Sequence, residues 1–213
     1  MERRAEPAAA LLVACALRIE QAALRSGGER GAPDGYALLR TGMGPRAADL
    51  AVARALGPGG DRTAVLATGF CAGLAPGMNP GDLIVAEETR DPRGTVVCDG
   101  TALLAEALAR AVPGRTVHLG ALTGSDHVVR GQERAQLRAT GAIAVDMESA
   151  ATLWTATRDR RGPVAAVRVI VDAPEHELVR IGTVRGGISA FRVLRAVLPA
   201  FYDWHRSLLL PRR

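Results

Sequence analysis

Nearly continuous apolar runs alternate along the chain with segments whose apolar residues recur at helical spacing. Runs of the first kind predict strands that are covered on both faces. They lie at 8–17, 36–42, 63–69, 82–87, 116–123, 142–147 and 164–171. Segments of the second kind predict helices at 45–56, 101–111, 132–139, 149–160 and 186–209. The alternation predicts an α/β fold: a single three-layer domain over 1–213 whose central sheet, mostly parallel or mixed, is flanked by helices.

Two glycine-rich segments come directly after predicted strands, at 41–48 and 67–91. Neither has the spacing GxGxxG or GxxxxGK[ST], which argues against a dinucleotide-binding fold and a P-loop. Gly69 stands at the end of a strand, where glycine lets backbone N–H groups approach a ligand. Gly44 and Arg46 lie at the start of a helix and have the pattern of an anion site; a plain turn with a solvated arginine is the alternative.

The segment AVDMESAA at 144–151 places two carboxylates where a predicted strand becomes a helix. An acidic residue in that position can reach into a crevice at the sheet edge, and Glu148 also lies near the positive end of the helix. A carboxylate there suits paired hydroxyls such as those of a ribose. The alternative is a capping acid before a core helix. We assign Asp146 a structural role.

Composition narrows the class of partner and the compartment. The net charge is +5 and the pI about 10.0, but the 27 basic residues are all arginines scattered along the chain, and aromatic residues make up 3%. Without a basic tract or stacking platforms, no nucleic-acid partner is expected. Three widely spaced cysteines fit reduced core thiols in a cytoplasmic protein, and no metal site is expected.

Six segments taken in order resemble the purine and uridine phosphorylase superfamily, which includes methylthioadenosine/S-adenosylhomocysteine nucleosidase. They are CALRIEQAAL, RTGMGPRAA, ATGFCAGLAPGMNPGD, LTGSD, AIAVDMESAA and VAAVRVIVD, and they span nearly the whole chain. Within the superfamily the chain looks most like the hopanoid-associated branch, which is described as acting on adenosylhopane.

The resemblance implies roles for five residues of this sequence. Glu148 would accept hydrogen bonds from the ribose 2′ and 3′ hydroxyls, with Met147 packed against the sugar. Asp172 would be the general acid that protonates purine N7, and Glu20 would activate water. Arg168 would lie near the sugar and the water. Without the resemblance, Asp172 is a turn acid, Glu20 a surface acid on the first turn of a helix, and Arg168 a paired structural charge.

Departures from the family pattern bear on the co-substrate and the pocket. Phosphorylases carry a phosphate-binding arginine and serine where this chain has Ala67 and Phe70, so hydrolysis gains over phosphorolysis and Phe70 is assigned to the substrate pocket. Val171 replaces the nucleosidase serine before Asp172, which changes the hydrogen bonding of that aspartate. Val128 replaces an aromatic residue, and it suits an apolar 5′ substituent; an ordinary core position is the alternative.

The same resemblance implies further properties. Asp126 is assigned to the loop before the base and sugar pocket. The substrate is expected to be a small nucleoside or a lipid-linked adenosine, with water or inorganic phosphate as co-substrate and no cofactor. A homodimer or larger homo-oligomer is expected. The C-terminal YDWHRSLLLPRR has groups that suit transient membrane-surface contact, and a terminal helix docked on the core is the favoured alternative. Methylthioadenosine, S-adenosylhomocysteine or futalosine hydrolysis, and a binding protein without catalysis, stay open.

Overall fold

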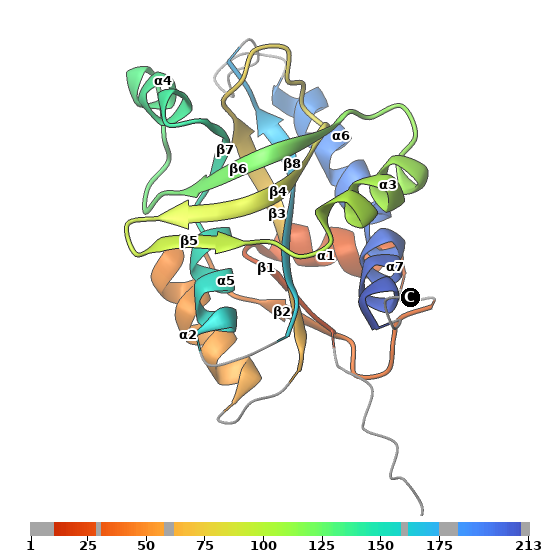
Figure 1. Ribbon diagram of the computed structural model, residues 1–213. Helices are drawn as coiled ribbons and strands as arrows, with labels where there is room; N and C mark the ends of the chain where they lie inside the picture. The colour runs from red at the N-terminus through yellow and green to blue at the C-terminus, as the bar shows by residue number, and fades with distance from the viewer. Residues whose placement is uncertain (1–10, 29–30, 58–61, 159–161, 175–182, 210–213) are drawn as a thin grey trace, which may run out of the picture.

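Strands and helices alternate along the chain in the computed structural model, which describes residues 11–28, 31–57, 62–158, 162–174 and 183–209 (Figure 1). The strands are β1 (Leu11–Cys15), β2 (Ala37–Arg40), β3 (Ala64–Gly73), β4 (Leu83–Asp91), β5 (Gly94–Val97), β6 (Val117–Gly124), β7 (Ala142–Asp146) and β8 (Val164–Asp172). The helices are α1 (Arg18–Gly27), α2 (Pro45–Leu56), α3 (Thr101–Ala111), α4 (Gln132–Ala139), α5 (Ser149–Thr157), α6 (Thr183–Ala196) and α7 (Leu198–Leu209).

The described strands form one mixed sheet in the order β2-β1-β3-β7-β6-β4-β5. Strand β8 pairs in parallel with β3 and antiparallel with β4, so that β3, β7, β6, β4 and β8 form a closed circuit of paired strands. Parallel pairing also joins β1 to β2 and β3. As a result the carboxyl ends of β1, β3 and β8 lie at the same edge of the sheet, where a small-molecule site is expected.

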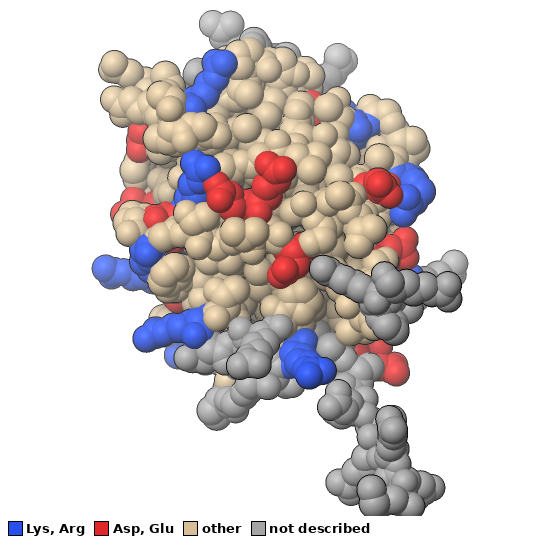
Figure 2. Space-filling view, viewed as in Figure 1, with Lys and Arg blue, Asp and Glu red and all other residues tan. Residues whose placement is uncertain are grey.

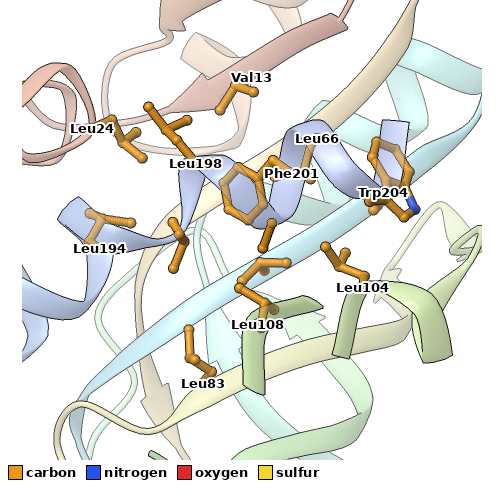
Figure 3. Packing of buried hydrophobic residues seen from close by; sticks show 14 of the residues in the cluster. Val13, Leu24, Leu66, Leu83, Leu104, Leu108, Leu194, Leu198, Phe201 and Trp204 are labelled. Carbon is orange, nitrogen blue, oxygen red and sulfur yellow. The ribbon is translucent and has the colours of Figure 1, made fainter. Parts of the chain in front are cut away.

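Helices cover both faces of this sheet, which confirms the predicted three-layer α/β fold (Figure 1). Helices α1, α3, α6 and α7 pack on one face, and α2 and α5 on the other. Alternate residues of β1 divide between the two layers: Leu11 and Val13 join the first core and Leu12 the second. In the first core Phe201 of α7 lies among leucines of α1, α3, α6 and the sheet (Figure 3).

The predicted bounds of α2, α3 and α4 are confirmed, whereas the predicted helix over 186–209 is wrong as a single element. It is divided at Val197 into α6 and α7. The physical cause is Pro199, which has no backbone N–H to donate to the carbonyl four residues earlier and whose ring crowds that carbonyl, so that α6 cannot continue through it. Proline is tolerated in the first turn of a new helix, where α7 carries it.

Two strand boundaries also differ from the prediction. Strand β3 continues past Gly69 to Gly73, into the segment that the glycine pattern assigns to a connection. Strand β4 runs on to Asp91 and turns back into β5, which the apolar pattern does not predict because its residues are mostly exposed. The turn pairs Asp91 with Gly94 across Pro92 and Arg93, and an Asp-Pro-x-Gly sequence is typical of a type I turn.

The C-terminal aromatic residues do not face solvent. Tyr202 and Trp204 are buried in the first core, which removes the aromatic groups proposed for membrane contact; residues 210–213 of that segment lie outside the described residues. On the face drawn in Figure 2 the arginines are separated, with acidic side chains among them. No helix within the described ranges is both long and apolar enough to cross a bilayer.

Phe201→Ala is expected to lower the free energy of unfolding by about 3–5 kcal/mol, because it leaves a cavity in a fully buried position. Leu209→Ala, at the exposed end of the same helix, is the matched control and should cost less than about 1 kcal/mol. Urea denaturation of both variants measures the difference. Equal losses would contradict the packing in Figure 3.

Candidate active site

A cavity of about 190 Å³ opens where several strands end. Residues after β1, at the ends of β7 and β8, within the last part of β3, and in the loop before α4 form its walls. The lining residues are Ala16, Leu17, Glu20, Met43, Phe70, Cys71, Ala72, His127, Val128, Val129, Arg134, Val145, Asp146, Met147, Glu148, Val171 and Asp172. Crevices outside the carboxyl ends of strands are where α/β proteins bind small ligands.

Glu20 lies in the first turn of α1, but it is 2% exposed and points into the cavity, so the alternative of a surface acid is wrong. Its Oε2 accepts hydrogen bonds from the backbone N–H groups of Ala16 and Leu17, at 2.9 and 2.8 Å. Its Oε1 accepts the N–H of Phe70 at 2.8 Å. An ionised carboxylate has about four lone-pair sites, so these three bonds fix the group and leave it one site for a further donor such as water.

Gly69 makes room for charged side chains. A Cβ at this position would lie 2.4 Å from Glu20 Oε1 and 2.7 Å from Arg168 Nη1. Its φ of +134° is also rarely adopted by residues with side chains. The sequence assigned Gly69 to the phosphate or water region through its backbone; the structure gives it instead the task of letting Glu20 and Arg168 approach each other.

Arg168 of β8 is 1% exposed and lies beneath the cavity among carboxylates. Its Nη2 is 2.5 Å from Asp146 Oδ2, its Nε donates to Ser149 Oγ at 2.8 Å, and its Nη1 is 3.9 Å from Glu148 Oε2. Among the described residues, Nη1 has no hydrogen-bond partner. A buried arginine needs polar partners. Asp146, Glu148 and Ser149 of AVDMESAA face the sheet because they provide these partners.

Glu148 occupies the junction between β7 and α5, with its carboxylate lining the cavity. Its Oε1 accepts the backbone N–H of Gly44 at 2.8 Å. Burial raises the pKa of the Glu148 carboxyl above its ordinary value, and the nearby Asp146 adds to the rise, while Arg168 opposes it. The Gly44 N–H is therefore already used by a protein carboxylate, so Gly44 does not offer it to an anion as the sequence predicted.

Arg46 and Asp126 lie outside this cavity. Both line a neighbouring one of about 670 Å³, which shares His127 and Met147 with the first. Asp126 is highly exposed, and its Oδ1 lies 2.7 Å from His127 Nδ1. The structure therefore does not bring Arg46 and Gly44 together into an anion site, and Asp126 reaches the first cavity only through His127.

Apolar side chains form much of the wall and the rim. Met147 and Phe70, both assigned to the substrate, line the cavity. Val128, assigned to the 5′ substituent, also lines it and is 60% exposed. Leu17 and Met43, which the sequence did not single out, stand beside it as two further exposed apolar groups. The entrance therefore has an apolar rim, while carboxylates lie deeper.

Asp172 ends β8 and lines the cavity together with Arg134 of α4. The two side chains form a buried ion pair in which Arg134 Nη1 donates to Asp172 Oδ1 at 3.3 Å and Nη2 donates to Oδ2. The sequence predicts altered hydrogen bonding at Asp172 because of Val171. Arg134 supplies that bonding, and no signal in QERAQLRA separates Arg134 from the solvated Arg138.

His127 also lines the cavity. Its Nδ1 contacts Asp126, and its Nε2 lies 3.0 Å from Glu133 Oε1 on α4. The pKa of His127 is raised by the hydrogen bond to Asp126 and next by Glu133. In the described part of the chain no group of three or more His, Cys, Asp or Glu residues has the arrangement of a metal site.

Solved structures with the same fold come from several bacteria. A 5′-methylthioadenosine/S-adenosylhomocysteine nucleosidase from Neisseria meningitidis, in complex with methylthio-immucillin-A, has a TM-score of 0.72 at 21% identity, over 94% of this chain and 99% of that one. Futalosine hydrolase of Helicobacter pylori has a TM-score of 0.71 at 16% identity, over 92% and 98%. At these identities the likeness concerns the fold.

A search of the curated proteins finds no match. The family described as the phosphorylase superfamily matches residues 34–199. That range includes most of the cavity residues, although Glu20 lies before it. Placement in the hopanoid-associated branch stays a prediction. Because the match spans well over half of its 213 residues, the chain belongs to the phosphorylase superfamily.

Proposed function

We propose that this protein cleaves the N-glycosidic bond of a 5′-modified adenosine and releases adenine. One observation carries the proposal: Glu20, Glu148 and Asp172 line a single cavity. Glu20 and Glu148 lie above the buried guanidinium of Arg168, and Asp172 lies at another wall. Glycosidic cleavage needs negative charge near the sugar, where an oxocarbenium-like centre forms, and an acid near the leaving base. The fold shared with nucleosidases and futalosine hydrolase agrees with this chemistry.

In this proposal Glu148 accepts hydrogen bonds from the ribose 2′ and 3′ hydroxyls, and Met147 packs against the sugar. Asp172 gives a proton to N7 of the purine as the electron pair of the C1′–N9 bond passes to the base. Glu20 uses its remaining lone pair to orient water for attack at C1′, and takes up the proton that the water loses. A positioned acid of this kind contributes about 10² to 10⁴ in rate.

Water is the proposed nucleophile in preference to phosphate. The cluster beneath the sugar position has one guanidinium, Arg168, against the carboxylates of Glu20, Asp146 and Glu148. An excess of negative charge favours a cationic transition state and disfavours an incoming anion. Arg46 lines the neighbouring cavity, and the Gly44 N–H is bonded to Glu148. No cofactor enters the proposed reaction.

The apolar rim of Leu17, Met43 and Val128 supports a substrate with an apolar 5′ substituent. We propose adenosylhopane as the best candidate, since its 5′ substituent is a large hydrocarbon. Methylthioadenosine, with a small apolar group, is the second candidate. S-adenosylhomocysteine and futalosine carry polar groups, which the second cavity with Arg46 and Asp126 would have to accommodate. A second copy of the chain covering the rim is also consistent with the proposed homo-oligomer.

A substrate panel tests the function. The purified protein should release adenine from at least one 5′-substituted adenosine, with the fastest release from members whose 5′ substituent is apolar. The other product should be the free sugar, whether or not phosphate is added to the reaction, and chromatography measures it. Formation of a sugar 1-phosphate only when phosphate is present would show that the reaction is phosphorolysis and not hydrolysis. Tight nucleoside binding without base release from any member would contradict an enzymatic role.

The acid limb of the pH profile of kcat/KM should report the protonation of the Glu148 carboxyl. Because burial raises its pKa, kcat/KM should fall as the pH drops through a value above the ordinary 4.5, where the carboxylate becomes protonated and loses acceptor capacity. Glu148→Gln should lower kcat/KM about 10- to 150-fold, the equivalent of one charged hydrogen bond, and remove this limb. Glu106→Gln, on the exposed face of α3, is the control and should match the wild type. An acid limb at or below pH 4.5 in the wild type would contradict the role of Glu148.

A further inference from the structure

Helix α4 buries one residue, and that residue is charged. Of its eight residues, Gln132–Ala139, Arg134 is the one that is buried. In Figure 1 the helix lies beyond β7, at the edge of the molecule and apart from the other helices. Amphipathic helices of globular proteins normally bury an apolar stripe. In α4 the apolar contact is limited to the partly buried Leu137, and the buried side chain is a guanidinium that pairs with Asp172.

Other polar contacts hold α4 in place around this side chain. Glu133, next to Arg134, contacts His127 Nε2 at 3.0 Å. At the other end, Arg90 Nη1 donates to the carbonyl oxygen of Thr140 at 3.0 Å. Arg134 Nε itself donates to the Val129 carbonyl at 3.3 Å. The guanidinium is therefore anchored through Nε, and both of its terminal nitrogens are directed at the Asp172 carboxyl.

The proposed reaction generates charge at the atoms that Arg134 contacts. When the Asp172 carboxyl passes its proton to N7, it becomes a carboxylate, while the base leaves as a neutral molecule. A guanidinium already in place stabilises that carboxylate as it forms, without reorganisation. A guanidinium does not give up its own proton near neutral pH, so Arg134 cannot replace Asp172 as the acid. The contacts of Arg134 with both carboxyl oxygens are those that suit the carboxylate left after proton transfer, and the cycle closes when Asp172 takes a proton from solvent.

We propose that Arg134 is a positioning residue for Asp172: it orients the carboxyl towards the leaving base and compensates the negative charge that develops on it. The inference rests on the proposed function and deepens it. It makes α4 part of the leaving-group machinery. A purely structural ion pair would instead fasten α4 to the end of β8, and its loss would affect every substrate in the same way.

The test compares two leaving groups in the same variants. Arg134→Gln should lower kcat for adenine release from the best substrate of the panel about 10- to 100-fold, with KM changed less than about threefold. Arg134→Lys should recover part of the loss. On the N7-methylated form of the same nucleoside, whose base leaves without a proton, Arg134→Gln and Asp172→Asn should both stay within about threefold of the wild type.

Arg138→Gln, one turn further along α4 and exposed, is the matched control and should behave as the wild type on both substrates. Circular dichroism should show that the variants are folded. Equal losses on both substrates, or an unaffected Arg134→Gln enzyme, would overturn the positioning role while leaving the proposed function intact. A wild-type protein that releases no base from any substrate would instead refute the proposed function, and this inference with it.

Discussion

The guanidinium of Arg168 is the interaction on which the rest of the site depends. It is buried in the middle of β8 with Asp146 at 2.5 Å and Glu148 at 3.9 Å. A Cβ at Gly69 would collide with both Arg168 and Glu20. A buried charge without partners costs several kcal/mol, so the fold must bring carboxylates to it. It does so from distant parts of the chain, and the same carboxylates line the cavity.

This constraint accounts for several local features at once. Residue 69 is a glycine because any Cβ would displace Glu20 or Arg168. The three backbone N–H groups around Glu20 hold its carboxylate beside a second acidic group without letting it turn away. The Gly44 N–H does the same for Glu148. Both carboxylates are thus fixed by backbone donors, which places two carboxylates at the proposed sugar position, while the guanidinium of Arg134 lies at the Asp172 side of the same cavity.

The sequence predicted those parts of the fold that follow from periodicity. Helices α2, α3 and α4 have the predicted bounds because in each a glycine directly precedes the first residue of the helical spacing. The exposed strand β5 carries no apolar run, and the division between α6 and α7 depends on one proline. At the site, the resemblance led to Glu20, Glu148 and Asp172, which share one cavity.

Partnerships across long separations could not be predicted from the sequence. Gly44 and Arg46 are neighbours in the chain, yet the backbone of the first serves Glu148 and the side chain of the second lines another cavity. Arg134 lies in a polar helix whose pattern is typical of a solvated one, and only the path of α4 past the end of β8 directs it to Asp172. Such pairings depend on tertiary placement, which a local pattern does not encode.

In the proposed function one cavity offers negative charge to a ribosyl cation. The most direct measurement compares, by calorimetry at neutral pH, the affinities of two analogues of the same nucleoside. One has a protonated nitrogen in place of the ribose ring oxygen, and the other has an uncharged carbon there. The cationic analogue should bind at least about tenfold more tightly, a difference of about 1.4 kcal/mol. Equal affinities, or tighter binding of the uncharged analogue, would contradict it.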